Sequence, residues 1–189
     1  MPTITSKNTS VNSTKVPAIY NKIDWKKLRD NFRQIKGYRP TFYIFDIGCG
    51  RNPNLIHDFL ATELNKYETR WCYLPYDPYW LDDLTNERNL ETWYGNNGSI
   101  GCVICSNVLN VLQDDKQVEK LHKMMHDGWK NYSVPYFITV YEGDGSGIGK
   151  KTKPDCYQRN LKTSEYAMLG EAIRYGVISP YFVKEFIKK

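Results

Sequence analysis

The segment from Phe45 to Asn54, FDIGCGRNPN, constrains the fold more than any other part of the sequence. It follows the apolar run TFYI and precedes a segment with helical spacing. An acid and two glycines at a strand end can form a simple turn, because glycine adopts backbone angles that other residues avoid. The same arrangement lets a nucleotide-like ligand lie against bare backbone. Both interpretations place a strand-to-helix turn here.

Helical and strand patterns alternate along the chain. Apolar spacings of three or four residues predict helices after Asp24, an expected N-cap, and over 54–67, 115–130 and 163–175, with a weaker, charged helix over 81–93. Short apolar and β-branched runs predict strands over 41–47, 70–76 and 135–141, and a strand that runs into a turn over 101–112. The tail, 176–189, fits either a strand or a helix. The alternation predicts an α/β fold with a doubly wound, mostly parallel sheet flanked by helices.

The composition of the chain predicts one folded domain that is preceded by a polar arm. Residues 1–18 are rich in Ser, Thr, Asn and Lys without an apolar period, which predicts a flexible N-terminal arm. Residues 19–189 show no linker or repeat and are expected to form one domain. The chain shows no signal-peptide layout and no apolar run long enough to span a bilayer. We therefore expect a cytoplasmic protein with no membrane partner.

The cysteines and histidines do not form a metal pattern. The five Cys are an odd number without a secretory signal, which argues against a disulfide framework. Cys102 and Cys105 form a C-x-x-C inside an apolar run, so we interpret them as buried strand thiols rather than a redox or zinc pair. His122 and His126 share a helix face, but no second Cys pair at zinc spacing accompanies them. We expect no metal site.

Acids stand at the ends of two predicted strands. Asp46, Gly48 and Gly50 follow the first strand, and Asp77 follows the second. The carboxyl ends of parallel strands are where a doubly wound sheet binds ligands, and an acid at the second strand end can accept hydrogen bonds from ribose hydroxyls. Pro53 replaces the third glycine of a dinucleotide turn, and no Lys-Ser/Thr pair follows. The set suits a neutral or cationic nucleoside, although Asp77 could also serve only as a turn former.

FDIGCG, followed by an acid at the next strand end, resembles the class I S-adenosylmethionine (SAM)-dependent methyltransferases over about residues 40–145. The resemblance implies a Rossmann-like sheet, with a reduced C-terminal hairpin as one form, and SAM as the cofactor. It implies that Gly48 and Gly50 line the methionine part of SAM. It also implies that Asp46 supports the turn or the ammonium group, and that Asp77 binds ribose.

The same resemblance assigns the residues around the strand over 101–112. Ser106 and Asn107, at its end, would meet cofactor or substrate, although both could be turn residues. Asn97, before the strand, would contact adenine. The Pro-Pro motif of amino-methylating DNA enzymes is absent after this strand, and the chain has no Pro-Cys pair for cytosine C5 chemistry. The accepting atom therefore stays open.

The segment over 140–160, VYEGDGSGIGKKTKPDCYQRN, carries four glycines and two acids. We interpret it as a substrate-gating loop, since long loops at such edges often carry function, with a merely mobile loop as the alternative. Tyr141, Glu142 and Asp144, together with Asn107, are candidates to orient or deprotonate an acceptor. SNVLNVL, YEGDGSGIG and YQRN together are similar to small methyltransferase-like proteins of phage and restriction-associated gene neighbourhoods, which implies a DNA-related role.

Basic and aromatic residues follow these glycines. Lys150, Lys151 and Arg159, with Tyr157 among them, suit contact with phosphates and stacking on bases, although a solvated charge run is the alternative. The net charge of +5 is compatible with a nucleic-acid partner without indicating one.

These observations predict a SAM-dependent transferase, in first place a methyltransferase of nucleic acid, DNA before RNA. Three alternatives stay open: an aminocarboxypropyl transferase that uses SAM, a non-catalytic SAM-binding or partner subunit, and a small-molecule methyltransferase. A homodimer is also compatible with the sequence.

Overall fold

A computed structural model describes residues 15–37, 40–67, 69–95, 99–153, 156–169, 171–173, 177–179 and 186–188. The helices are α1 (Ala18–Lys22), α2 (Trp25–Lys36), α3 (Pro53–Leu64), α4 (Asp83–Gly95) and α5 (Asp115–Tyr132), with the 3₁₀ helices η3 (Asn65–Tyr67), η5 (Leu109–Val111) and η6 (Thr163–Leu169). The strands are β1 (Phe42–Ile47), β2 (Trp71–Tyr76), β3 (Ile100–Ser106), β4 (Tyr136–Thr139), β5 (Lys150–Lys153), β6 (Cys156–Gln158), β7 (Glu171–Ile173) and β8 (Val177–Ser179).

The main sheet has the strand order β2-β1-β3-β4-β8-β7. The first four strands are parallel, and α3, α4 and α5 connect them in turn, as parallel pairing requires. β8 pairs antiparallel with β4, and β7 antiparallel with β8. The predicted α/β class with a mostly parallel central sheet is therefore confirmed, and the arrangement is compatible with a Rossmann-like fold.

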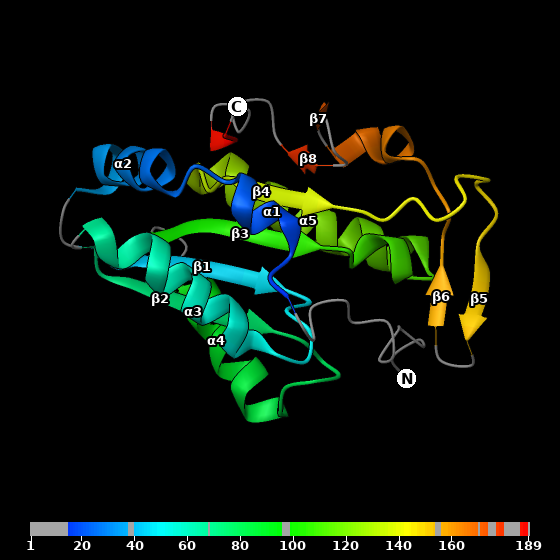
Figure 1. Ribbon diagram of the computed structural model, residues 1–189, viewed down its shortest axis with the longest axis horizontal. Coiled ribbons are helices and arrows are strands. Elements are labelled where there is room, and N and C mark those ends of the chain that lie inside the picture. Colours follow the sequence, from blue (N-terminus) through cyan, green and yellow to red (C-terminus); the bar gives the residue numbers. More distant parts are fainter. Residues whose placement is uncertain are drawn as a thin grey trace.

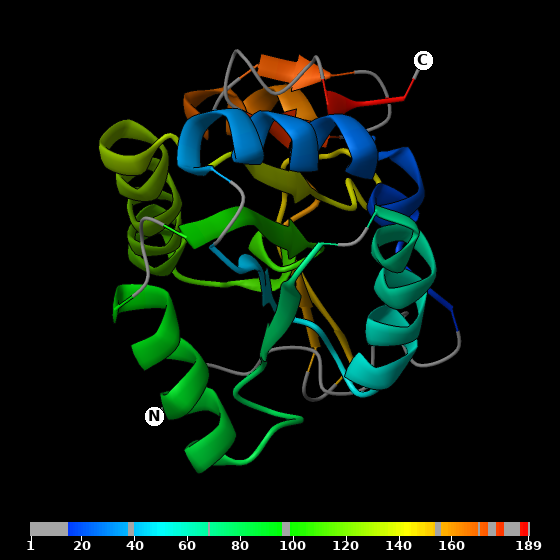
Figure 2. The same cartoon turned by 90° about the vertical axis from the view of Figure 1, so that its left-hand side faces the viewer.

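Helices cover both faces of the sheet (Figures 1 and 2). Alternate residues of β1 serve the two faces: Phe42 and Ile44 join the core beneath α1, α2 and α3, whereas Phe45 and Ile47 join the core beneath α4 and α5. This period of two in a strand buried on both faces explains why the run reads as continuously apolar.

The local signals at the first helices are confirmed. The Asp24 carboxylate accepts a hydrogen bond from the Lys27 N–H at 3.0 Å, which caps α2 as predicted. The short helix α1 was not anticipated. Of the expected arm over residues 1–18, residues 1–14 lie outside the described ranges, and Val16 packs partly buried against the core.

The prediction of a helix over 163–175 is wrong. Residues 163–169 form the 3₁₀ helix η6, which is kinked at Tyr166, and residues 171–173 form β7. The apolar spacing is compatible with a helix, but β7 and β8 instead extend the sheet beyond β4. Backbone pairing at an open sheet edge is a non-local interaction that overrides local periodicity.

Two further segments differ from expectation. The stretch over 140–160 was expected to be a loop throughout, yet it contains the antiparallel hairpin β5–β6. In the tail, Val177–Ser179 form a strand, and residues near the end return to α1: Ile187 bridges Ile23, and the Lys188 N–H donates to the Lys22 carbonyl at 2.7 Å.

Cys102 and Cys105 lie three apart in β3 and therefore point to opposite faces. Cys102 belongs to the core beneath α2 and Cys105 to the core on the other side. Burial raises the pKa of both thiols above its ordinary value. They are buried strand thiols, as predicted. Within the described ranges, no helix has both the length and the apolar character needed to cross a bilayer.

The contact between β1 and β3 depends on Gly101. A Cβ atom at this position would lie 2.1 Å from a ring carbon of Phe42, which is fully buried. The sheet therefore packs around an aromatic ring that needs a bare backbone in the neighbouring strand.

We predict that Gly101→Ala lowers the free energy of unfolding by about 1–3 kcal/mol, because the Phe42 ring must shift within a closed core. Gly95→Ala is the matched control, since a Cβ there meets nothing within 4 Å. The control should be neutral or stabilise by up to about 1 kcal/mol, as alanine is the better helix former. Urea unfolding followed by circular dichroism measures both, and equal stability of the two variants would contradict this packing account.

Candidate functional site

The carboxyl ends of β1, β2 and β3 meet at one edge of the sheet, where the strand order changes direction. From β1 the chain crosses to β2 on one side, and later to β3 on the other side of β1. The loops after β1 and β3 consequently diverge, and this is where doubly wound sheets bind ligands. The predicted site residues after these strands therefore come together at one edge.

The glycine turn, Gly48–Gly50, leaves β1 in a conformation that needs glycine. Gly48 has φ +73° and Gly50 has φ +78°. The N–H groups of Gly48 and Cys49 both donate to the Tyr76 carbonyl, at 2.7 and 3.3 Å. A Cβ at Gly48 would lie 2.2 Å from a methyl carbon of Val108, in the loop after β3. The bare backbone of Gly48 is thus already covered by Val108.

Asp77 joins this turn to the loop after β2. One carboxylate oxygen accepts the Gly50 N–H at 3.0 Å, and the other accepts the Tyr79 N–H at 2.9 Å. The side chain of Asn86, in α4, binds both the N–H and the carbonyl of Asp77. Burial raises the pKa of Asp77, and the N–H groups of Tyr79, Gly50 and Trp80 oppose that rise. A carboxylate has about four acceptor positions, so these three N–H groups leave about one position for a further donor.

The loops after β1 and β2 also touch through an aromatic contact. The Arg51 guanidinium carbon lies 5.6 Å from the centre of the Trp80 ring, within cation–π range. Arg51 follows the glycine turn directly, and Trp80 lies three residues after Asp77. The pair gives the edge a flat, partly exposed wall.

Asp46 lies beneath the turn and is enclosed. Only 1% of the residue is exposed, and the Tyr73 hydroxyl donates to its carboxylate at 2.6 Å. Burial raises the pKa of Asp46 to about 6; hydrogen bonding to Tyr73 and proximity to the Tyr20 hydroxyl lower it, and the charge of Asp77 raises it. The Tyr20 hydroxyl is itself buried without a hydrogen bond of normal geometry. Asp46 is therefore a buried acid bound by a tyrosine of the neighbouring strand, and it does not face solvent.

The end of β3 is held against β4. The hydroxyls of Ser106 and Thr139 lie 2.9 Å apart, and the Asn107 N–H donates to the Thr139 carbonyl at 2.8 Å. Ser106 is buried, whereas Asn107 is exposed and has φ +58°, an unusual conformation for a residue other than glycine. Asn107 thus presents an amide at the carboxyl edge. Asn97, the predicted adenine contact, lies outside the described residues.

Two of the predicted catalytic acids are already engaged. Hydrogen bonds from the hydroxyl and N–H of Thr163 hold the pKa of Glu142 below its ordinary value. Asp144 pairs with Lys150 at 2.7 Å and accepts the Ser146 N–H, which places its pKa far below the usual range. Tyr141, in contrast, is 63% exposed just after β4. Tyr141 and Asn107 are therefore the predicted catalytic residues that stay open to a substrate.

The hairpin β5–β6 stands beyond the carboxyl ends of β1 and β3 and runs across their direction (Figure 1). Lys151 and Tyr157 are directly paired across the hairpin, so their side chains share one face. Lys150 is paired with Gln158 in the register and forms the ion pair with Asp144. The predicted combination of cation and aromatic thus exists, carried by Lys151 and Tyr157.

The remaining residues of the YQRN motif attach the hairpin to the domain. The Gln158 amide donates to the Tyr141 carbonyl at 2.7 Å and accepts from Asn110, in η5, at 3.2 Å. Arg159 donates to the Leu112 carbonyl at 2.8 Å and pairs closely with Asp115. The Arg159 guanidinium therefore binds groups within the fold, whereas the sequence predicted that it would contact phosphate.

Several of these residues gave no sequence signal. Asn86 lies in a segment that reads only as weakly helical, and Asn110 lies in an apolar run. Arg51 and Trp80 each look like ordinary loop residues in the sequence, because the contact between their two loops is visible only in the structure. An asparagine on the inner face of a helix is the one usable hint, because buried amides need partners.

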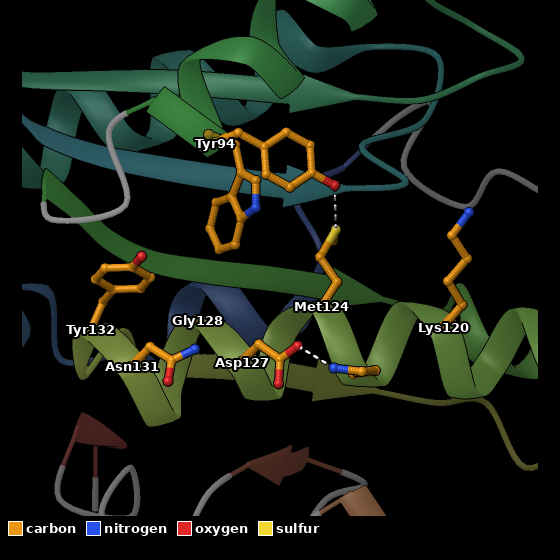
Figure 3. A pocket seen from close by; sticks show the side chains of 9 residues that line it. Tyr94, Lys120, Met124, Asp127, Gly128, Asn131 and Tyr132 are labelled. Carbon is orange, nitrogen blue, oxygen red and sulfur yellow. Dashed lines mark hydrogen bonds and ion pairs between the residues drawn. The ribbon is translucent and has the colours of Figure 1, made fainter.

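A separate groove of about 380 Å³ lies between α4 and α5 (Figure 3). Tyr94 reaches across it to the sulfur of Met124, and Lys123 pairs with Asp127 along its rim. The groove contains none of the residues that follow the strand ends. The chemistry of the carboxyl edge, rather than the size of this groove, therefore assigns the candidate site.

Among the described residues, no three metal-binding side chains gather at one point; the rings of His122 and His126 lie 5.7 Å apart. Comparison of the chain with protein-family models, curated proteins and solved structures gave no match. The functional argument therefore depends on the geometry of the carboxyl edge.

We predict that Asp46→Asn gains stability relative to the wild type as the pH rises. The pKa of Asp46 is about 6 in the folded state, above its ordinary value of 3.8, so ionisation costs folding energy as the pH rises between these values. Between pH 5 and pH 7.5 the variant should gain about 1 kcal/mol on the wild type.

Asp58→Asn is the control, because Asp58 is an exposed acid on α3. Thermal unfolding of the three proteins at both pH values gives the comparison. A pH-independent difference between Asp46→Asn and the wild type would show that Asp46 is not a strained buried acid.

Proposed function

We propose that the protein is a SAM-dependent methyltransferase that acts on nucleic acid. The observation that carries this proposal is the clasp between Asp77 and Gly50, which joins an acid at the end of β2 to a glycine turn at the end of β1. It stands at the edge where the strand order reverses, as a nucleoside site requires. The hairpin β7–β8, which extends the sheet beside β4, further supports the class I methyltransferase form of the fold.

The charges of this edge suit a cationic nucleoside. Asp46 and Asp77 are near enough for the charge of one to raise the pKa of the other, and we see no Lys-bearing phosphate turn after β1. SAM would supply a sulfonium-bound methyl group to a nucleophile. In the proposal, the acceptor position that Asp77 has left accepts a ribose hydroxyl, and the glycine turn borders the methionine part.

Asn107 and Tyr141 are the residues we propose to meet the acceptor. Methyl transfer from a sulfonium depends mainly on alignment of the nucleophile with the methyl carbon. Asn107 offers an exposed amide at the end of β3, and Tyr141 an exposed ring after β4. Glu142 and Asp144 act in this proposal as loop-stabilising acids, because Thr163 and Lys150 already engage them.

Nucleic acid is the proposed substrate because the hairpin extends a cation and an aromatic residue past this edge. Lys151 is exposed, and Tyr157 is opposite it. Such pairs contact phosphates and stack on bases. DNA is the first polymer to test.

A non-catalytic SAM-binding subunit is the second candidate. It is favoured by the engagement of Glu142 and Asp144 within the loop, which leaves no free acid among the predicted catalytic residues. Mass analysis of the products separates the possibilities: S-adenosylhomocysteine (SAH) indicates methyl transfer, methylthioadenosine indicates aminocarboxypropyl transfer, and neither product with bound SAM indicates a binding subunit.

We predict that SAM and SAH bind the protein in calorimetric titration, and that Asp77→Ala weakens SAH binding about tenfold or more through loss of a charged acceptor. Asp83→Ala, an exposed acid in the first turn of α4, is the control and should leave the affinity unchanged.

A thermodynamic cycle separates the ribose contact from the clasp. The wild type should bind SAH more tightly than the 2′-deoxy analogue of SAH, and Asp77→Ala should lose this preference. An equal preference in both proteins would remove the ribose assignment, and absence of binding to SAM and SAH would remove the proposed cofactor.

We predict that Lys151→Gln weakens binding to duplex or single-stranded DNA and makes the dependence of log K on log salt shallower by about one, as loss of one phosphate contact implies. Lys150→Gln should change the slope less, because its ammonium already pairs with Asp144. Lys130→Gln, at the far end of α5, is the control. Fluorescence anisotropy across a salt series measures the slopes, and identical slopes for Lys151→Gln and the control would exclude Lys151 from the nucleic-acid surface.

A further inference from the structure

Ile148 is an exposed apolar residue whose backbone N–H and carbonyl both form hydrogen bonds. The residue is 72% exposed. Its N–H donates to the Ser146 hydroxyl at 3.2 Å, and its carbonyl accepts from the Asn160 side chain at 2.8 Å. Asn160 is itself only 1% exposed, so the attachment point is part of the folded interior.

The glycines around Ile148 shape this projection. Gly147 has φ +73°, and its N–H donates to the Asn160 carbonyl at 2.9 Å. A Cβ at Gly149 would lie 1.8 Å from the Tyr157 hydroxyl. Glycine at these two positions therefore lets the loop turn tightly and pack on the hairpin while Ile148 points into solvent.

A single exposed apolar residue needs no explanation in most proteins. Here, however, two large exposed side chains belong to one short segment, since Tyr141 is 63% exposed at the other end of the same loop. Tyr141 lies two residues after Thr139, the end of β4, whose carbonyl accepts the Asn107 N–H. Ile148 lies two residues before the strand that carries Lys150 and Lys151. The loop thus carries an exposed aromatic ring near the carboxyl edge and an exposed aliphatic side chain close in sequence to Lys150 and Lys151.

A base inside a duplex cannot reach such an edge. Enzymes that act on bases draw the nucleotide out of the stack, which costs the lost base pairing and stacking. Apolar side chains such as Ile are suited to occupy base steps that are opened in this way, because they replace stacking contacts without needing hydrogen-bond partners. Aromatic rings are suited to stack on the extruded base.

We propose that Ile148 is a wedge that enters the base stack of duplex DNA, and that Tyr141 stacks on the nucleotide drawn out toward the glycine turn. This inference rests on the proposed function and deepens it, because it names duplex DNA with one extruded nucleotide as the substrate form. Lys151 and Tyr157 hold the strand beside the opening. The rigid attachment through Asn160 keeps the wedge in place.

The test compares Ile148→Ala, Ile148→Leu and the control Leu84→Ala, because Leu84 is a similarly exposed aliphatic residue on α4. Each protein is titrated into a DNA duplex that carries 2-aminopurine, whose fluorescence rises when it leaves the stack, and into the matching single strand. All three variants change exposed side chains, and their melting temperatures check that folding is retained.

The expected result is that Ile148→Ala binds the duplex at least about fivefold more weakly and loses most of the fluorescence rise, because unstacking is no longer offset. Its affinity for the single strand should stay within about twofold of the wild type, since phosphate contacts are retained. Ile148→Leu and Leu84→Ala should both behave as the wild type.

If Ile148→Ala showed the fluorescence rise and the duplex affinity of the wild type, the proposed wedge role of Ile148 would be overturned. The proposal of nucleic-acid binding would not be affected by that result. An equal loss for duplex and single strand would also overturn it, because Ile148 would then be a general contact. Absence of DNA binding by the wild type would overturn both the wedge and the proposed polymer substrate, and SAH titration would show separately whether the cofactor assignment survives.

Discussion

The hydrogen bond from the Gly50 N–H to the Asp77 carboxylate is the interaction on which the candidate site depends. It fixes the loop after β1 against the loop after β2. The Tyr79 N–H donates to the other carboxylate oxygen of Asp77, and the Asn86 side chain binds the backbone N–H and carbonyl of Asp77. A buried carboxylate is stabilised by such N–H donors and is costly without them. The acid and the glycine turn therefore form one structural unit, whatever ligand they meet.

The rest of the carboxyl edge is assembled outward from this unit by contacts between short loops. Val108 packs on Gly48, and the segment that carries Val108 continues into η5, whose Asn110 binds Gln158 of the hairpin β5–β6. The proposed cofactor turn and the proposed nucleic-acid surface are thus parts of one contiguous, hydrogen-bonded edge. The hairpin can stand past the ends of β1 and β3 because its base is closed by buried amides.

The sequence was informative where structure is decided locally. The strand β1, the glycine turn and the Asp24 cap follow from apolar alternation, from positive φ at glycine and from a side-chain acceptor three residues before its donor. It was uninformative where distant segments meet. The residues over 171–173 have helical spacing but pair in the sheet, and Arg159 looks like a phosphate contact but is bound to Asp115. Which loops touch depends on the strand order, and no local pattern encodes that order.

The central claim is that a nucleoside cofactor binds against the glycine turn, and backbone amide NMR tests it most directly. SAH would be added to ¹⁵N-labelled protein while the amides of Gly48 and Gly50 are followed, with Gly95 and Gly101 as internal references. The account predicts saturable shifts of Gly48 and Gly50, while Gly95 and Gly101 stay in place. Unmoved Gly48 and Gly50 resonances at saturating SAH, with shifts at Tyr94 and Met124 in the groove between α4 and α5, would contradict it.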